Sequence, residues 1–217
     1  MSLQIGIVGL ANVGKSTLFN ALTNAGALAA NYPFATIEPN TGIVGVPDER
    51  LAVLGKMYES DKIVPATVEF VDIAGLIAGA SKGEGLGNKF LANIRECKVI
   101  CHVVRAFKDG NVTHVANSVD PKRDIETVET ELALADIDSL ERALVKMRKD
   151  TKSGNKEAIA KVAMAEKVLD ELKSGKTHVE PVEGLDLLSA KPVFYMFNLD
   201  EDELTDEAKL AELSAMV

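Results

Sequence analysis

The sequence predicts an α/β protein: a three-layer domain into which an antiparallel pair of helices is inserted. Strand and helix patterns alternate over the first hundred residues, which is typical of a three-layer α/β domain. From Asp124 to about Ser174 the strand pattern disappears, and apolar residues recur at helical spacing. A continuous apolar strand pattern then returns at Pro192–Phe197. The helical segment is therefore expected to interrupt one domain.

Short apolar runs separated by turn-forming residues define the elements of this domain. The turn residues are densest at 31–40, where Pro33 and Pro39 exclude regular structure. The expected strands are Gln4–Val8, Gly42–Val46, Thr67–Val71, Val99–Arg105 and Pro192–Phe197. The expected helices are Lys15–Asn24, a short one from Pro47 through Met57, Asn88–Arg95 and Glu203–Met216.

Two helices are expected in the insertion, with turn residues between them at 153–155. The apolar positions of the first helix slip by one residue partway along, and those of the second are regular. They are Ile125, Val128 and Leu132, then Ala133, Ile137, Leu140, Leu144 and Met147, and in the second helix Ile159, Val162, Ala165, Leu169 and Leu172. The slip fits a coiled coil with an interruption. The predicted division is a domain over 1–123, a hairpin over 124–182 and the continued domain over 183–217.

Composition excludes several classes of protein. The formal net charge of −9 argues against binding nucleic acid over the whole surface. Two cysteines, Cys97 and Cys101, are too few for a disulfide framework and are expected to be buried thiols in a reducing compartment. No apolar run approaches the ~18–20 residues that cross a bilayer, and no signal sequence precedes the first strand. We therefore expect a cytoplasmic protein without a membrane segment.

The run Gly9–Ser16 has the spacing of a phosphate-binding loop, with a strand before it and a helix after it. Glycines in such a loop let backbone N–H groups surround phosphate oxygens, and the helix N-terminus adds positive potential. Lys15 is expected to reach the β- and γ-phosphates, and the Ser16 hydroxyl to bind Mg²⁺. The expected nucleotide-binding residues here are Asn12, Val13, Gly14, Lys15, Ser16 and Thr17.

A second motif, Asp-x-x-Gly, follows the third expected strand. Asp72 would stand at the end of that strand, facing the phosphate loop, and would hold Mg²⁺ through water. Gly75 would offer its N–H to the γ-phosphate. The segment between the two motifs should supply a further hydroxyl ligand for Mg²⁺; Thr36 is preferred, and Thr41 is the alternative.

The position after Gly75 bears on hydrolysis. In Ras-like GTPases a glutamine there orients the attacking water, whereas this sequence has Leu76, which forms no hydrogen bond to water. Hydrolysis is therefore slow, or another group positions the water. His114 is the candidate, since His102 lies inside a strand as an expected core residue and His178 lies beyond the hairpin. The predicted catalytic set is Lys15, Gly75 and His114.

The fifth strand leads into Asn198-Leu199-Asp200-Glu201, where guanine-specific proteins carry Asn-Lys-x-Asp. Asn198 is in place to brace the base, but Leu199 replaces the lysine. Glu201 replaces the aspartate, and its carboxylate would lie roughly 1.5 Å out of register with the guanine edge. Losing such a paired contact costs several kcal/mol of discrimination. The base expected from these residues moves from guanine toward adenine.

These motifs together resemble the YchF-type, or Obg-like, family of P-loop ATPases related to translation factors. The matching segments are the phosphate loop with Gly6–Leu10, 31–42 with its Asn-Tyr-Pro-Phe run, the glycine-rich stretch Asp72–Asn88, the helical insertion and Asn198–Glu201. The resemblance implies ATP bound in preference to GTP, a hydrophobic residue in place of the catalytic glutamine, matched here by Leu76, and association with ribosomes. Mg²⁺ is the cofactor expected from the phosphate loop. The resemblance also implies a C-terminal TGS domain, which this sequence does not contain.

Two further expectations concern the C-terminal end of the domain and the tip of the hairpin. A Ras-like domain of this order needs another strand and a closing helix after Met216, so the chain is expected to be a fragment. The hairpin tip, 146–156, concentrates lysine and arginine on an otherwise acidic protein. Such a tip suits phosphate contacts in ribosomal RNA, and equally suits a solvated helix end.

Three alternatives to an ATPase switch stay open. An Obg-type GTPase would still use Glu201 to bind guanine. A metabolite kinase would need arginines clustered over the phosphates, and arginines are few here. A pure interaction module would have lost nucleotide binding altogether, so that replacing Lys15 would change nothing.

Overall fold

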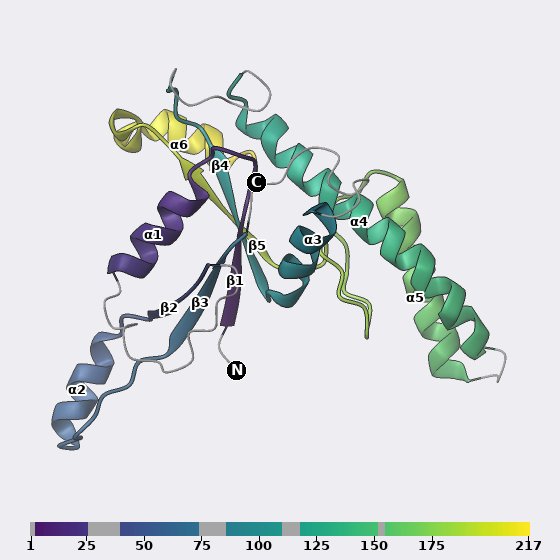
Figure 1. Ribbon diagram of the computed structural model, residues 1–217, viewed down its shortest axis with the longest axis horizontal. Coiled ribbons are helices and arrows are strands. Elements are labelled where there is room, and N and C mark those ends of the chain that lie inside the picture. Colours follow the sequence, from purple (N-terminus) through teal and green to yellow (C-terminus); the bar gives the residue numbers. More distant parts are fainter. Residues whose placement is uncertain (1–2, 26–39, 74–85, 110–117, 152–154) are drawn as a thin grey trace.

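The computed structural model describes residues 3–25, 40–73, 86–109, 118–151 and 155–217, and the statements below concern these ranges. Five strands form a single sheet in the order β2-β3-β1-β4-β5 (Figure 1). β1, β3, β4 and β5 run parallel, and β2 is antiparallel to β3. The strands are β1 (Leu3–Val8), β2 (Thr41–Gly45), β3 (Thr67–Asp72), β4 (Val99–Arg105) and β5 (Val193–Asn198).

Helices connect these strands as a three-layer α/β domain requires. α1 packs on β1 and β3, whereas α3 and the start of α4 pack against β1 and β4 on the opposite side of the sheet (Figure 1). The helices are α1 (Lys15–Ala25), α2 (Glu49–Met57), α3 (Leu86–Glu96), α4 (Pro121–Asp150), α5 (Lys156–Lys173) and α6 (Glu207–Ser214). The fold class expected from the alternating pattern is confirmed.

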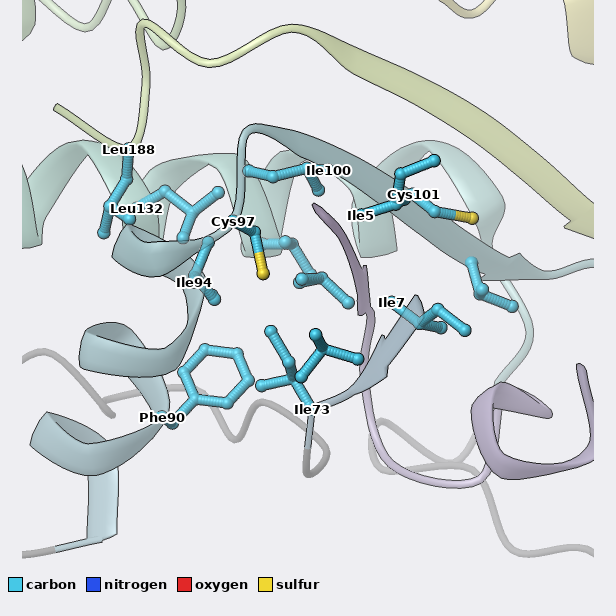
Figure 2. Close-up of a cluster of buried hydrophobic side chains, with 14 of the residues drawn as sticks. Ile5, Ile7, Ile73, Phe90, Ile94, Cys97, Ile100, Cys101, Leu132 and Leu188 are labelled. Carbon is cyan, nitrogen blue, oxygen red and sulfur yellow. The ribbon is translucent and has the colours of Figure 1, made fainter. Parts of the chain in front are cut away.

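The main core covers both faces of the sheet (Figure 2). Ile100 of β4 and Ile94 of α3 belong to the α3 side and are almost completely buried, whereas Ile7 of β1, which pairs with Cys101, points to the opposite face. Cys97 and Cys101 belong to this core as free thiols, and burial raises their pKa values to about 11 and 12. They are thus buried thiols, as expected, and at neutral pH both stay protonated.

A second core joins α4 to α5 and explains the slip in the apolar pattern. Val128 and Leu132 of α4 pack into the main core with the sheet. Ala133, Leu140 and Leu144 instead belong to the core with α5, while Ala135 still belongs to the main core. The one-residue slip therefore reflects two apolar faces of α4 that overlap along the helix at 132–135, one for each core. An interrupted coiled coil is not needed to account for it.

Two element boundaries differ from expectation because of N-caps. Asp120 accepts a hydrogen bond from Arg123 N, so α4 begins at Pro121, three residues before the predicted hairpin boundary at 124. Asp206 accepts from Ala208 N and Lys209 N, and thereby starts α6. The single helix predicted over Glu203–Met216 is therefore wrong: a 3₁₀ turn, Glu201–Thr205, precedes a separate, shorter helix. The division into 1–123, 124–182 and 183–217 stays a prediction.

A network of polar side chains connects α4 of the hairpin to the rest of the domain. Asp136 of α4 is fully buried and accepts hydrogen bonds from the backbone N–H and hydroxyl of Ser189 at 2.8 and 2.7 Å. Arg95 of α3 lies 3.4 Å from the same carboxylate and donates to Ser139 of α4 at 3.0 Å. Lys191 also belongs to this network, because its ammonium group donates to the carbonyl oxygen of Arg95. None of the helices in the described ranges combines the length and apolar character needed to cross a membrane.

Candidate nucleotide-binding site

The carboxyl ends of β1, β3, β4 and β5 meet at one edge of the sheet, because these strands are parallel. Ligands of open α/β sheets bind in the crevice outside this edge. The residues that follow the strands here include the phosphate loop after β1, Asp72 at the end of β3 and Asn198 at the end of β5. The topology thus brings together motifs that lie far apart in the sequence.

The loop after β1 has a backbone that requires glycine at two positions. Gly9 and Gly14 have φ angles of +155° and +102°, and Asn12 has +61°. A β-carbon on Gly9 would lie 2.4 Å from the carbonyl oxygen of Val103, and one on Gly14 would lie 2.5 Å from Nδ2 of Asn198. The loop therefore lies against the ends of β4 and β5, and no larger residue fits there.

Lys15 begins α1 and is almost completely buried. Its ammonium group donates to the carbonyl oxygen of Leu10 at 2.6 Å, so the side chain bends back across the loop. Burial lowers the pKa of Lys15 to about 8, and the nearby Asp72 carboxylate opposes part of this shift. Such a desolvated cation gains much from an anion placed beside it, because little water screens the pair.

Ser16 and Asp72 meet although 56 residues separate them in sequence. The Ser16 hydroxyl donates to Oδ2 of Asp72 at 2.7 Å. β3 carries Asp72 to this position through its parallel pairing with β1, which places Ile7 opposite Asp72. The two predicted Mg²⁺ ligands of the described part of the chain therefore stand side by side. Hydroxyl and carboxylate oxygens are the ligands that Mg²⁺ prefers.

The remaining predicted residues of this region divide into two groups. Thr17 is exposed on the first turn of α1, and Thr41 is the first residue of β2, opposite Val71 of β3. Thr36, Gly75, Leu76 and His114 lie outside the described residues. Their predicted roles, as Mg²⁺ ligand, γ-phosphate contact, replaced glutamine and water-positioning group, stay predictions.

Asn198 connects the fifth strand to the phosphate loop. Its side-chain amide donates to the carbonyl oxygen of Val13 at 3.0 Å. Leu199 is half-buried beyond it, and Glu201 is exposed as the first residue of the 3₁₀ turn. The structure therefore places the predicted base-binding segment directly beside the predicted phosphate-binding segment.

The two other histidines lie elsewhere. His102 is buried within β4 with its ring 5.5 Å from that of Tyr195, and burial lowers its pKa to about 4. This agrees with the expectation of a core residue. His178 follows α5, and its Nε2 lies 3.1 Å from Glu129 of α4. It belongs to the contact between hairpin and sheet.

One part of the site was not anticipated from the sequence. The segment after β4 is fastened to Asn198, whose carbonyl oxygen accepts from the N–H groups of Ala106 and Phe107 at 2.8 and 2.9 Å. Arg105 is buried beneath this segment, with its guanidinium 4.2 Å from the centre of the Phe107 ring. Arginine is seldom buried. An arginine as the last residue of an otherwise apolar strand is therefore a sequence signal that could have indicated a role for the segment after it.

The strand order, the glycine-dependent loop after β1 and the Ser16–Asp72 pair define a P-loop nucleoside triphosphatase domain of the Ras-like class. Comparison with known proteins agrees. The family described as "50S ribosome-binding GTPase" matches residues 4–149. A relative from Haemophilus ducreyi, named "Ribosome-binding ATPase YchF", is 52% identical over 97% of this chain and 60% of its own length. The relative of the same name from Bacillus subtilis is 49% identical over 99% of this chain and 63% of its own length.

A solved structure shows the same likeness. The structure of the Schizosaccharomyces pombe YchF GTPase superposes with a TM-score of 0.75 at 38% identity, over 98% of this chain and 62% of that one. The chain therefore belongs to the 50S ribosome-binding GTPase family and, within it, to the YchF family. It spans about 60% of the length of the Haemophilus and Bacillus relatives.

Proposed function

We propose that this protein is a Mg²⁺-dependent nucleoside triphosphatase that binds ATP in preference to GTP and hydrolyses it slowly. The observation that carries the proposal is the Ser16–Asp72 contact at 2.7 Å beside the buried Lys15 ammonium. These groups supply two oxygen ligands and one cation at the N-terminus of α1. Few sites other than one for a metal-bound triphosphate need that combination.

Each group has a stated part in this proposal. Ser16 and Asp72 would hold Mg²⁺, with Thr36 as a further ligand, and the chemistry that this ion would supply is neutralisation of phosphate charge. Lys15 leaves the Leu10 carbonyl to contact the phosphates. Gly75 donates its N–H to the γ-phosphate. Leu76 leaves the attacking water without the usual glutamine, so turnover is slow, and His114 is the proposed substitute.

The preference for adenine rests on the residues that follow β5. Asn198 braces the base while its amide holds the phosphate loop through Val13. Leu199 offers an apolar side chain where guanine-specific proteins have lysine, and Glu201 is an exposed, longer carboxylate in place of aspartate. The names of the relatives support both nucleotides, since the Haemophilus and Bacillus proteins are named ATPases and the yeast structure is titled a GTPase.

We further propose that the nucleotide state controls association with ribosomes, which would place the protein in the cytoplasm. The support is that the relatives are named ribosome-binding proteins. The hairpin tip is the proposed contact with ribosomal RNA. Lys146, Lys149 and Lys156 are exposed there, whereas Arg148 is paired with Glu166 at 2.7 Å. Any further domain of the full-length protein would add to this interface.

A nucleotide titration tests the central proposal. Dissociation constants for ATP and GTP are measured with and without Mg²⁺, alongside the variants Lys15→Ala and, as a control, Lys56→Ala on the exposed face of α2. We expect tighter binding of ATP, dependence on Mg²⁺, and loss of at least about tenfold in affinity in Lys15→Ala alone. A clear preference for GTP would overturn the choice of base. Undiminished binding by Lys15→Ala would overturn the site.

A further inference from the structure

Residues 106–109, which follow β4, are held against the proposed base-binding segment at a second point. Oδ2 of Asp200 accepts a hydrogen bond from the backbone N–H of Lys108 at 3.0 Å. The first fastening, from Ala106 and Phe107 to the Asn198 carbonyl, lies two residues earlier on both segments. The two segments are therefore connected like a short, irregular continuation of the β4–β5 pairing.

The second fastening differs from the first in using a side chain. No β-ladder continues past Asn198, because the chain turns there into the 3₁₀ turn that begins at Glu201. The N–H of Lys108 meets the Asp200 carboxylate instead. A hydrogen bond from a backbone N–H to a carboxylate is roughly twice as strong as one between neutral groups. Lys108 is itself exposed, so replacing Asp200 with alanine would leave its N–H to bond with water and would release this end of the segment from Asp200.

Arg105 holds the same segment from beneath. Its guanidinium donates to the carbonyl oxygens of Phe107 and Asp109 at 3.3 and 3.2 Å, and the Phe107 ring lies over it. Residues 106–108 are therefore held by the buried Arg105 on one side and by Asn198 and Asp200 on the other. We call these three residues the wall next to Asn198. Because Asn198 in turn holds Val13, the wall, the base-binding segment and the phosphate loop are one connected unit.

We infer that Asp200 is a positioning residue for the nucleotide base: it holds the wall of residues 106–108 in place beside Asn198, so that the site is formed before the base arrives. This inference rests on the proposed function, since it assigns the base to Asn198. A preformed wall avoids the entropy loss of ordering the segment on binding. Asp200 itself need not touch the base.

The test separates the base from the phosphates. Binding of ATP, GTP and inorganic tripolyphosphate, each with Mg²⁺, is measured for the unmodified chain and for Asp200→Ala, Asp200→Asn and Asp202→Ala. Asp202→Ala is the matched control, because it removes an exposed neighbouring carboxylate. We expect Asp200→Ala to weaken binding of the preferred nucleotide about tenfold and to leave tripolyphosphate binding unchanged. Asp200→Asn keeps an oxygen acceptor for the N–H of Lys108 and should restore most of the affinity.

Three outcomes would overturn the inference. They are nucleotide affinity unchanged in Asp200→Ala, an equal loss for nucleotide and tripolyphosphate, and an equal loss in Asp202→Ala. Thermal unfolding of each variant without ligand shows whether the fold survives the change. The proposed function fails separately, because a preference of the unmodified chain for GTP would show that the choice of adenine is wrong. In that case the ratio of the GTP dissociation constants of Asp200→Ala and the unmodified chain would still test the positioning role.

Discussion

Gly9 shows how a single residue makes the phosphate loop possible. The motif identifies it as a loop glycine, and the structure adds that its φ of +155° and the Val103 carbonyl both exclude a side chain. Lys15 and Asp72 were likewise predicted from the sequence by type and position. What the sequence did not reveal is that Lys15 is buried enough for its pKa to fall to about 8. That shift depends on atoms from several distant segments.

Replacing Gly9 with alanine should destabilise the fold by about 3 kcal/mol, because backbone atoms of β4 must move in addition to the strain of a positive φ. Gly175→Ala is the matched control. Gly175 also has a positive φ, +98°, but a β-carbon there meets nothing within 4 Å. The control should therefore cost only about 1 kcal/mol. Urea unfolding measures both, and equal losses would show that contact with Val103 contributes nothing.

At the scale of elements, α4 is the helix whose sequence was easiest to recognise and hardest to interpret. Its length and helical spacing were visible, but the reason for its one-residue slip was not. Only the structure shows that Leu132 belongs to the core of the sheet and Ala133 to the hairpin. The contact between the base of the hairpin and β5 was also invisible, since it joins Glu129, His178 and Tyr195 from three separate segments.

This contact should make stability depend on pH. Burial by itself would raise the pKa of Glu129, but hydrogen bonds from His178, Tyr195 and Thr177 lower it from 4.5 to about 2. A carboxylate with a lowered pKa stabilises the fold above its unfolded pKa, and this stabilisation is lost as the pH falls from 4.5 toward 2. Glu129→Gln should therefore lose about 2 kcal/mol at pH 6, and the difference from the unmodified chain should shrink below pH 4.5.

Urea unfolding of both proteins tests this, at pH values that start about 1.5 units above the ordinary pKa of 4.5 and go down about 1.5 units below it, into the window in which the stabilisation is lost. Glu126→Gln, an exposed carboxylate one turn earlier on α4, serves as the control and should show no such pH dependence. A constant difference between Glu129→Gln and the unmodified chain over the whole range would contradict the proposed ionisation of Glu129.

For the whole molecule, the distribution of charge contrasts with its total. The chain carries a formal net charge of −9, yet exposed lysines gather at the end of the hairpin. α4 and α5 extend away from the sheet, so this end projects beyond the nucleotide-binding domain (Figure 1). A local basic surface on an acidic protein favours a specific polyanion contact over general attraction to nucleic acid.

If that end contacts ribosomal RNA, replacing Lys146, Lys149 and Lys156 with glutamate in the full-length protein should weaken ribosome binding by about tenfold or more. The slope of log affinity against log salt should also fall by about 2, since fewer counterions are released. Co-sedimentation with ribosomes at several salt concentrations measures both quantities. The control is a second triple variant with the same change of charge away from the tip, in which Lys167, Lys173 and Lys176 are replaced with glutamate. The surface ion pairs of these lysines contribute little to stability. Equal effects of the two triple variants would exclude a specific role for the tip.

The sequence by itself determined the fold class, the phosphate loop and the family, because each is encoded in local patterns. A strand, a glycine turn and a helix N-terminus are properties of neighbouring residues, and Lys15 and Ser16 follow from them. The tertiary structure alone decided which distant groups meet: Ser16 with Asp72, Asn198 with Val13, and Asp200 with Lys108. The physical reason is that such pairs depend on the order and register of the strands, and those are set by packing across the whole sheet.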